Sequence, residues 1–141
     1  MSLLRKMEVI EAVRNYLETK GFKINRVVKD TTEHGTDIVA TSPRQKMIIK
    51  IEAKGQTSSN RSSKRFGKEF DKKQKEDHLG RALLKCLGYL DGGFAAGMAL
   101  SGDDYNKSLV DGIKKSLRML GLVVLLVSKN NGVSTIGNLP L

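Results

Sequence analysis

The chain has 141 residues and one cysteine, Cys86, so we expect a single domain over residues 1–141 with neither an intrachain disulfide nor a four-cysteine zinc site. Its longest apolar run, residues 121–127, is far shorter than the roughly 18 residues of a membrane span, and we expect no membrane partner. The formal net charge of +10 favours a polyanionic partner such as nucleic acid, although solubility alone can also account for it.

The first part of the chain predicts a helix followed by three strands. Residues 8–20 carry apolar side chains at helical spacing, and Gly21 ends the pattern. Charged side chains interrupt this stretch, so it lacks the apolar core of a signal peptide and we expect a cytoplasmic location. The strands are expected at residues 22–29, 34–41 and 45–53, with polar turns between them.

The third of these strands has two different faces. Side chains alternate between the faces of a strand, so the apolar residues at odd positions from 47 to 53 belong to the core. The even positions from 48 to 54 are mostly charged and include Glu52 and Lys54, which point the same way because they are two residues apart. A charged ladder that simply faces solvent would give the same pattern.

Residues 55–77 differ in composition from the rest of the chain. They are rich in Ser, Asn, Lys and Arg, which predicts a long basic loop, and long loops in compact domains are often functional. Its cations could follow the phosphate backbone of a duplex, although a solvated loop explains them equally well. The cations considered for this role are Arg61, Lys64, Arg65 and Lys68.

The remainder alternates between predicted helices and strands. A helix with an apolar face covers residues 79–90, and strand 94–100 follows it. A helix over 105–120, capped by Asp103 or Asp104, leads into strand 122–127 and, after a turn at 130–132, a last strand at 133–136. A meander followed by strand–helix–strand crossovers predicts an α/β domain, a three-layer α/β/α architecture with a mixed central sheet.

Asp37 and the triplet Glu52-Ala53-Lys54 carry the clearest chemical signal. If their strands pair as a hairpin, two carboxylates and one amine meet at one end of the sheet. Carboxylate oxygens and water are the ligands that Mg²⁺ prefers, and the amine can steady an attacking water or a phosphate. An aspartate beside a turn can instead hydrogen-bond nearby amides.

In this order of elements, Asp37 followed by Glu-X-Lys resembles the PD-(D/E)XK nuclease superfamily, which has the restriction-endonuclease-like fold. The resemblance covers residues 8–128, and Thr36 stands where the eponymous motif has proline. The turn at 21–22 and the Asp-Ile-Val-Ala strand are similar to those of small archaeal Holliday-junction-resolvase-type nucleases. Residues 55–90 are similar to uncharacterised bacterial proteins.

The resemblance implies an endonuclease that hydrolyses phosphodiester bonds in DNA and depends on Mg²⁺ or Mn²⁺. Asp37 and Glu52 would bind the metal together with the carbonyl of Ala53. Lys54 would orient or deprotonate the attacking water. The resemblance leaves RNA open as a substrate and a homodimer open as the assembly, since cutting two strands needs two sites.

Further residues enter the implied site from the two helices. Members of the superfamily often add a glutamate from the first helix, for which Glu11 is the first choice and Glu8 the alternative. They also place polar residues of the second helix near the scissile phosphate, and the matching positions are Gln74, His78 and Lys85. A general-acid role is open to His78, while an ordinary exposed histidine is the plainer interpretation.

Two other classes of function fit the same residues. A catalytically silent nucleic-acid-binding module on this fold would explain the positive charge equally well. A regulatory subunit would turn the same surface toward an acidic protein partner. The intact set of Asp37, Glu52 and Lys54 favours the enzyme.

Overall fold

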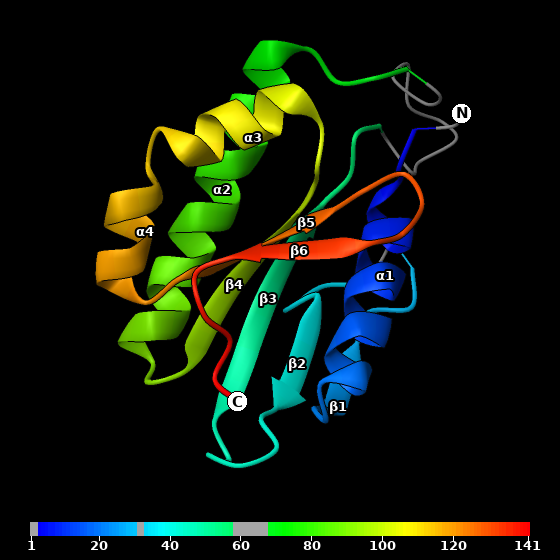
Figure 1. The fold of residues 1–141 in the computed structure, drawn as a ribbon. Coiled ribbons are helices and arrows are strands. Elements are labelled where there is room, and N and C mark those ends of the chain that lie inside the picture. The colour runs from blue at the N-terminus through cyan, green and yellow to red at the C-terminus, as the bar shows by residue number, and fades with distance from the viewer. Residues whose placement is uncertain (1–2, 31–32, 58–67) are drawn as a thin grey trace.

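A computed structural model describes residues 3–30, 33–57 and 68–141. These residues form an α/β fold with a six-stranded mixed sheet and four helices (Figure 1). The elements are α1 (Lys6–Thr19), β1 (Lys23–Val27), β2 (Ile38–Thr41), β3 (Ile48–Lys54), α2 (Lys72–Asp91), β4 (Ala95–Ser101), α3 (Asp104–Asp111), α4 (Lys114–Leu120), β5 (Val123–Val127) and β6 (Val133–Ile136). None of the helices in these ranges is long and apolar enough to cross a bilayer.

The strands lie in the sheet in the order in which they occur in the chain, from β1 to β6. β1, β2 and β3 form an antiparallel meander, β3, β4 and β5 run parallel, and β6 returns antiparallel to β5. Crossover helices connect the parallel strands, as such connections require. The mixed sheet that the sequence predicts is therefore confirmed.

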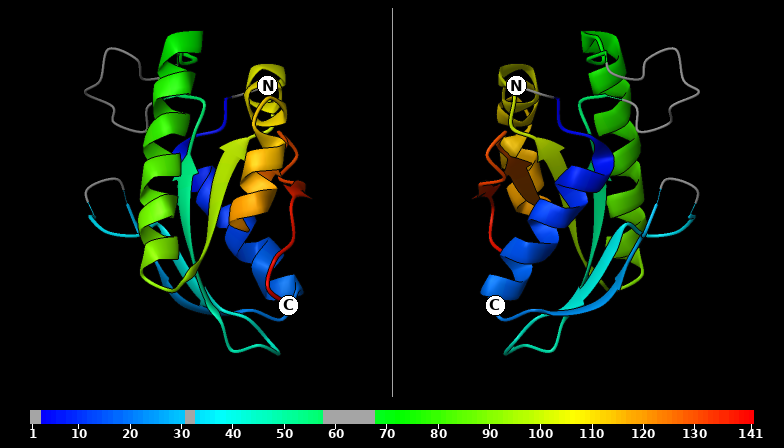
Figure 2. Two further views of the ribbon diagram at one scale, coloured as in Figure 1. Left: turned by 90° about the vertical axis from the view of Figure 1, so that its left-hand side faces the viewer. Right: turned by 90° about the vertical axis from the view of Figure 1, so that its right-hand side faces the viewer.

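Helices cover both faces of the sheet (Figure 2). α1 packs on one face, where Val9, Val13 and Leu17 contact the odd-numbered side chains of β3 and β5. α2, α3 and α4 pack on the other face, over the even-numbered side chains of β4 and β5. β4 and β5 are thus buried on both sides, which explains their continuous apolar sequences.

The single helix predicted over residues 105–120 is wrong, because the chain forms two helices there. α3 ends at Asp111 and α4 begins at Lys114, with Gly112 and Ile113 between them. Glycine is among the least favourable residues inside a helix, and the break lets both short helices lay apolar side chains on the same sheet face. Asp103 caps α3 as expected, since its carboxylate accepts a hydrogen bond from the backbone N–H of Asn106 at 2.9 Å.

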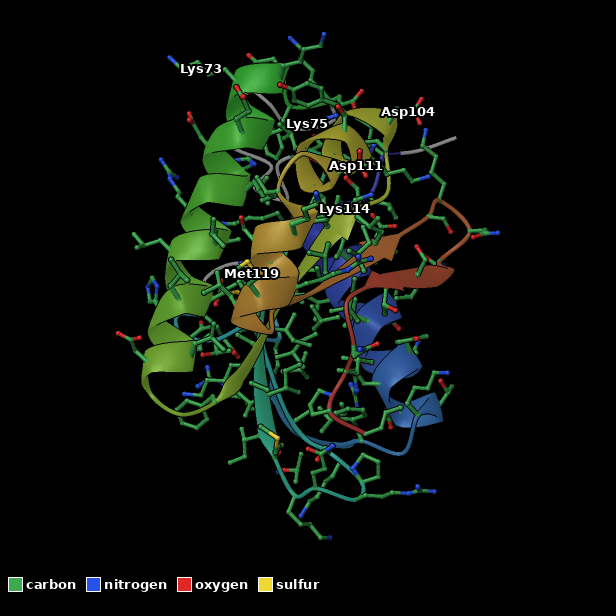
Figure 3. The ribbon with its side chains drawn as sticks, turned by 60° about the vertical axis from the view of Figure 1, so that its left-hand side comes forward. Lys73, Lys75, Asp104, Asp111, Lys114 and Met119 are labelled. Atoms are coloured by element: carbon green, nitrogen blue, oxygen red, sulfur yellow. The ribbon has the colours of Figure 1, made fainter. Side chains whose placement is uncertain are left out.

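The predicted loop 55–77 is too long at its C-terminal end, because α2 already begins at Lys72. Asp71 accepts a hydrogen bond from the Gln74 amide, and the Gln74 side chain accepts one from the Asp71 amide, both at 2.9 Å. This reciprocal pair is a capping box, which starts a helix without any apolar residue. Lys75, which is labelled in Figure 3, lies in the same turn. Its ammonium pairs with Glu69 and with Asp103 beside α3.

Candidate functional site

Asp37 and Glu52 lie opposite each other on neighbouring strands. The antiparallel register pairs Ile38 with Ile51, so Asp37, one residue before β2, falls across from Glu52 on the same face of the sheet. Both residues are almost excluded from solvent, since the whole residue is 3% exposed for Asp37 and 1% exposed for Glu52. Burial raises the pKa of the Glu52 carboxyl. The hydrogen bond from Tyr89 lowers this pKa, and the negative charge of Asp37 raises it.

The acid pair sits where β2 and β3 separate. Asp37 directly precedes β2, and its Oδ2 accepts a hydrogen bond from the backbone N–H of Ala53 on β3 at 2.9 Å. The side chain of Asp37 thus extends the contact between the two strands by one residue, just before β2 begins. The sequence interpretation of Asp37 as a residue that hydrogen-bonds a nearby amide is confirmed, and it does not conflict with a second role for the other carboxylate oxygen.

Lys6 forms an ion pair with Asp37. It is the first residue of α1, and its Nζ lies 2.9 Å from Asp37 Oδ1. Its backbone is held against Gly55, where an added Cβ would lie 2.4 Å from the Lys6 nitrogen. The backbone N–H of Gln56 also donates to the carbonyl of Leu4 at 2.7 Å. The chain before α1 therefore crosses directly over the residues that follow Lys54.

Glu52 is held by two side chains of α2. The hydroxyl of Tyr89 donates a short hydrogen bond to Glu52 Oε1 and accepts one from Thr36 Oγ1 at 3.2 Å. Burial and the hydrogen bond to Glu52 raise the pKa of Tyr89, so the hydroxyl stays a donor. Lys85 Nζ lies 3.5 Å from Glu52 Oε2, and its side chain is 56% exposed. The even-numbered face of β3 is thus covered at Glu52, and a ladder facing solvent is ruled out there.

Lys54 completes what we call the acid–lysine cluster, defined as Asp37, Glu52, Lys6, Lys54 and Lys85. Burial and the charge of Lys6 lower the pKa of the Lys54 amine, while Glu52 and Asp37 act in the opposite direction. Three amines face two carboxylates in this cluster. With all five groups ionised, the cluster carries net positive charge, which suits an anionic ligand such as a phosphate.

Replacement of Tyr89 by phenylalanine is expected to destabilise the protein by about 1–3 kcal/mol, the usual cost of leaving a buried hydrogen-bonding group without its partner. Glu52 would lose its short hydrogen bond in the variant. Urea denaturation followed by circular dichroism measures the effect. The matched control is Tyr105→Phe on α3, where the ring of Tyr105 lies under Lys72. An equal loss of stability in both variants would contradict the assignment of Tyr89 as the hydrogen-bond partner of Glu52.

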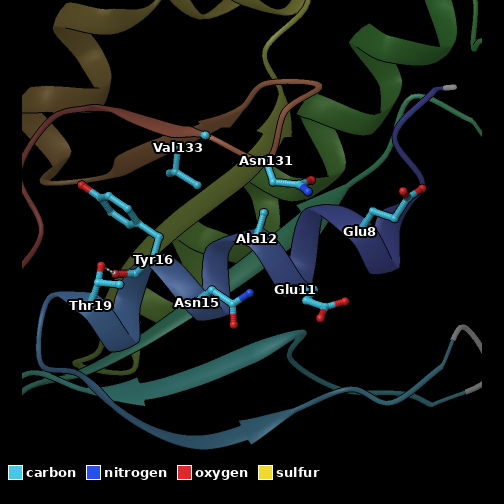
Figure 4. Close-up of a pocket in the computed structure, with 9 residues that line it drawn as sticks. Glu8, Glu11, Ala12, Asn15, Tyr16, Thr19, Asn131 and Val133 are labelled. Carbon is cyan, nitrogen blue, oxygen red and sulfur yellow. Dashed lines mark hydrogen bonds between the residues drawn. The ribbon is translucent and has the colours of Figure 1, made fainter. Parts of the chain in front are cut away.

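The two glutamates of α1 that were proposed as site residues line a hollow beside this helix. Glu11 is exposed and lines a hollow of about 460 Å³ between α1 and residues 131–133 (Figure 4). Glu8 also lines this hollow, and its carboxylate accepts hydrogen bonds from the backbone N–H and the Nε of Arg5, both at 3.0 Å. It is Lys6, not either glutamate, that α1 brings to Asp37.

The residues proposed to contact nucleic acid are in different situations. Arg61, Lys64 and Arg65 lie outside the described residues, and Lys68 is exposed. Gln74 forms the capping box of α2. His78 is half-buried, with its ring 4.5 Å from that of Phe70, and burial and the charge of Lys54 lower its pKa. Lys85 and His78 therefore lie near the acid pair and near Lys54, respectively.

The two carboxylates of the cluster, Asp37 and Glu52, are side chains of the kind that bind a divalent cation. Within the described ranges no group of three or more His, Cys, Asp or Glu side chains gathers to hold a metal, so a cation would depend on the two carboxylates, water and further oxygens. Such hard oxygen donors are those of Mg²⁺ and Mn²⁺ sites. Cys86 offers no alternative chemistry, because burial raises the pKa of its thiol to about 12.

Comparison of the chain with protein-family models, curated proteins and solved structures found no significant match. A functional interpretation therefore depends on the geometry of the acid–lysine cluster.

Proposed function

We propose that the protein is a metal-dependent endonuclease of the PD-(D/E)XK type, with a restriction-endonuclease-like fold, that hydrolyses phosphodiester bonds in DNA. The observation that carries this proposal is the position of Asp37 opposite Glu52, with Lys54 two residues further along the same strand. The order of helix, antiparallel meander, helix and parallel strand is also the one expected from the resemblance.

Asp37, Glu52 and the carbonyl of Ala53 would hold Mg²⁺ or Mn²⁺ in this proposal. When bound, such an ion supplies charge stabilisation on the phosphate and lowers the pKa of water. Because both acids are buried, their oxygens lie in an environment of low dielectric where interactions with charge are strong.

Lys54 acts on the attacking water or on the phosphate. Its lowered pKa makes the neutral amine more accessible than in an exposed lysine, so it can accept the proton of a water molecule. In its charged form the same group donates hydrogen bonds to a phosphate oxygen. Lys6 and Lys85 add positive charge that draws the phosphodiester toward the acid pair.

The proposal is tested with supercoiled plasmid, single strands, branched DNA and RNA, each incubated with Mg²⁺, Mn²⁺ or a chelator. We expect nicking of DNA that requires the metal. Lys54→Met is expected to slow it by about 100-fold or more, within the range typical of a lost acid–base group, while binding to duplex is retained. Lys20→Met at the far end of α1 is the control. Cutting that survives the chelator or Lys54→Met would overturn the proposal.

A second function is favoured by one observation, the pairing of both acids with lysines. Lys6 and Lys85 neutralise Asp37 and Glu52 without any metal, as a catalytically silent nucleic-acid-binding module would require. That function predicts duplex binding at low salt with no cleavage under any metal. The same set of incubations therefore separates the two candidates.

A further inference from the structure

We propose that Lys6 is the resident counter-ion of Asp37, and that a divalent cation binds tightly only after a phosphodiester has drawn the Lys6 ammonium away. The order of events would be nucleic acid first and metal second. This inference rests on the proposed function, because it concerns the same acid pair and the same class of substrate.

Both oxygens of Asp37 are already engaged. Oδ2 accepts the hydrogen bond of the Ala53 amide at 2.9 Å, and Oδ1 pairs with Lys6 Nζ at 2.9 Å. The side chain of Asp37 is 4% exposed, so water has little access to either oxygen. A cation that binds Oδ1 therefore competes with the Lys6 ammonium for the same carboxylate oxygen, whereas Oδ2 keeps its hydrogen bond to the Ala53 amide.

Of the two partners, Lys6 is the one that can leave. The amide of Ala53 belongs to the interior of β3 and cannot move without distorting the strand. Lys6 carries its ammonium on a flexible stem that is 34% exposed. Its backbone is fixed by the start of α1 and by the contact with Gly55, so rotation of the side chain alone would release Oδ1.

The charges of the cluster explain why a phosphodiester should come first. In the free protein a divalent cation would enter a cluster with three amines and two carboxylates, and its charge would be repelled. A phosphate group brings negative charge and a new partner for the ammonium of Lys6. Because coupling between two ligands is reciprocal, the metal must then strengthen nucleic-acid binding by the same factor.

The test measures metal affinity directly and needs no turnover. Isothermal calorimetry with Ca²⁺, a hard cation with the same oxygen preference, is carried out on the wild type, Lys6→Met and Lys6→Arg without nucleic acid. We expect Lys6→Met to bind Ca²⁺ about tenfold more tightly than the wild type or better, because a buried carboxylate loses its competing cation. Lys6→Arg keeps the charge and should bind like the wild type.

The matched control is Lys114→Met, since Lys114 also pairs with an acid, Asp111 at 2.9 Å, but lies on α4 (Figure 3). It should bind Ca²⁺ like the wild type. Circular dichroism checks that each variant is folded, and Lys6→Gln provides a second neutral side chain that should behave like Lys6→Met.

A second titration contains a short duplex, which a gel shows to be intact afterwards. The duplex should raise the Ca²⁺ affinity of the wild type more than that of Lys6→Met, whose Asp37 is already free. Equal affinities of Lys6→Met and the wild type without duplex would overturn the inference, as would Lys6→Arg binding like Lys6→Met. If either of these results is found while plasmid nicking persists, only the inference about Lys6 fails and the proposed function survives. If the expected Ca²⁺ affinities are found but no nicking occurs, only the nuclease proposal fails.

Discussion

Replacement of Glu52 by glutamine is expected to abolish metal-dependent cleavage while leaving the fold intact. Loss of a residue that hydrogen-bonds to a metal ligand lowers metal affinity or activity roughly 10–100-fold. Loss of the ligand itself should therefore lower the cleavage rate by about 1,000-fold or more. Glutamine has nearly the same shape, and its amide oxygen can still accept the hydrogen bond of Tyr89. Plasmid nicking and duplex binding are measured on the same preparation.

The same variant should be more stable than the wild type at neutral pH. Burial raises the pKa of Glu52 in the folded protein, so the folded chain binds this proton more tightly than the unfolded chain. The stability that Glu52 contributes is therefore complete at low pH and is lost as the pH rises through its folded pKa. Glutamine carries no charge, and its advantage should grow with pH and vanish in acid.

Urea denaturation at several pH values measures this trend. Glu18→Gln is the control, because Glu18 is exposed on α1 and pairs with Arg14 at 3.4 Å; cleavage should match that of the wild type. Wild-type cleavage by Glu52→Gln would contradict the role of Glu52 as a ligand. If the Glu52→Gln variant is less stable than the wild type at neutral pH, the buried charge of Glu52 does not lower the stability of the wild type as expected.

Replacement of Gly55 by alanine is expected to destabilise the protein by about 1–3 kcal/mol, in the range of other changes that overpack a tight contact. An added Cβ would lie 2.4 Å from the backbone nitrogen of Lys6 and 2.7 Å from the carbonyl carbon of Arg5. Both are backbone atoms, so no rotation of a side chain can relieve the clash. The segment before α1 has to move away from β3.

That movement breaks the contacts of the crossing segment. The carbonyl of Leu4 accepts from the Gln56 amide at 2.7 Å, and the amide of Leu4 donates to Gln56 Oε1 at 3.0 Å. Leu4 is buried and would be exposed, and Lys6 would be displaced from Asp37. Hydrogen exchange at the Gln56 amide, together with urea denaturation, reports the change.

Gly80→Ala provides the matched control. Gly80 lies on the exposed side of α2, where an added Cβ meets nothing within 4 Å. Alanine there should stabilise the protein by about 0.5–1 kcal/mol, because glycine loses more conformational freedom in a helix. Gly55→Ala at wild-type stability would show that the crossing segment is not packed as described.

The position of the acid pair could be predicted from the sequence because it depends on a short hairpin. The alternation of side chains in β3 fixes which way Glu52 and Lys54 point, and a hairpin brings Asp37 to the neighbouring strand. The hydrogen bond from Tyr89 to Glu52 was not predicted. Tyr89 follows Cys86 by three residues on the apolar face of α2, and a tyrosine on a buried face usually needs a partner for its hydroxyl; that signal was available.

Lys6 could not have been found in this way. Its contact with Asp37 joins residues that are far apart in the chain, through a crossing segment that has no periodic pattern. The early start of α2 was missed for another reason, since its first turn is polar and only the spacing of Asp71 and Gln74 marks it. The break at Gly112 was missed because the apolar spacing continues across it.

The most direct measurement is the anomalous scattering of Mn²⁺ in crystals grown with a short duplex. We expect a peak bound to the carboxylates of both Asp37 and Glu52, with the ammonium of Lys6 turned to a phosphate oxygen. Peaks confined to other acidic side chains, with Lys6 still paired to Asp37 and Lys85 to Glu52, would contradict the assignment of this cluster as a metal-dependent phosphodiesterase site.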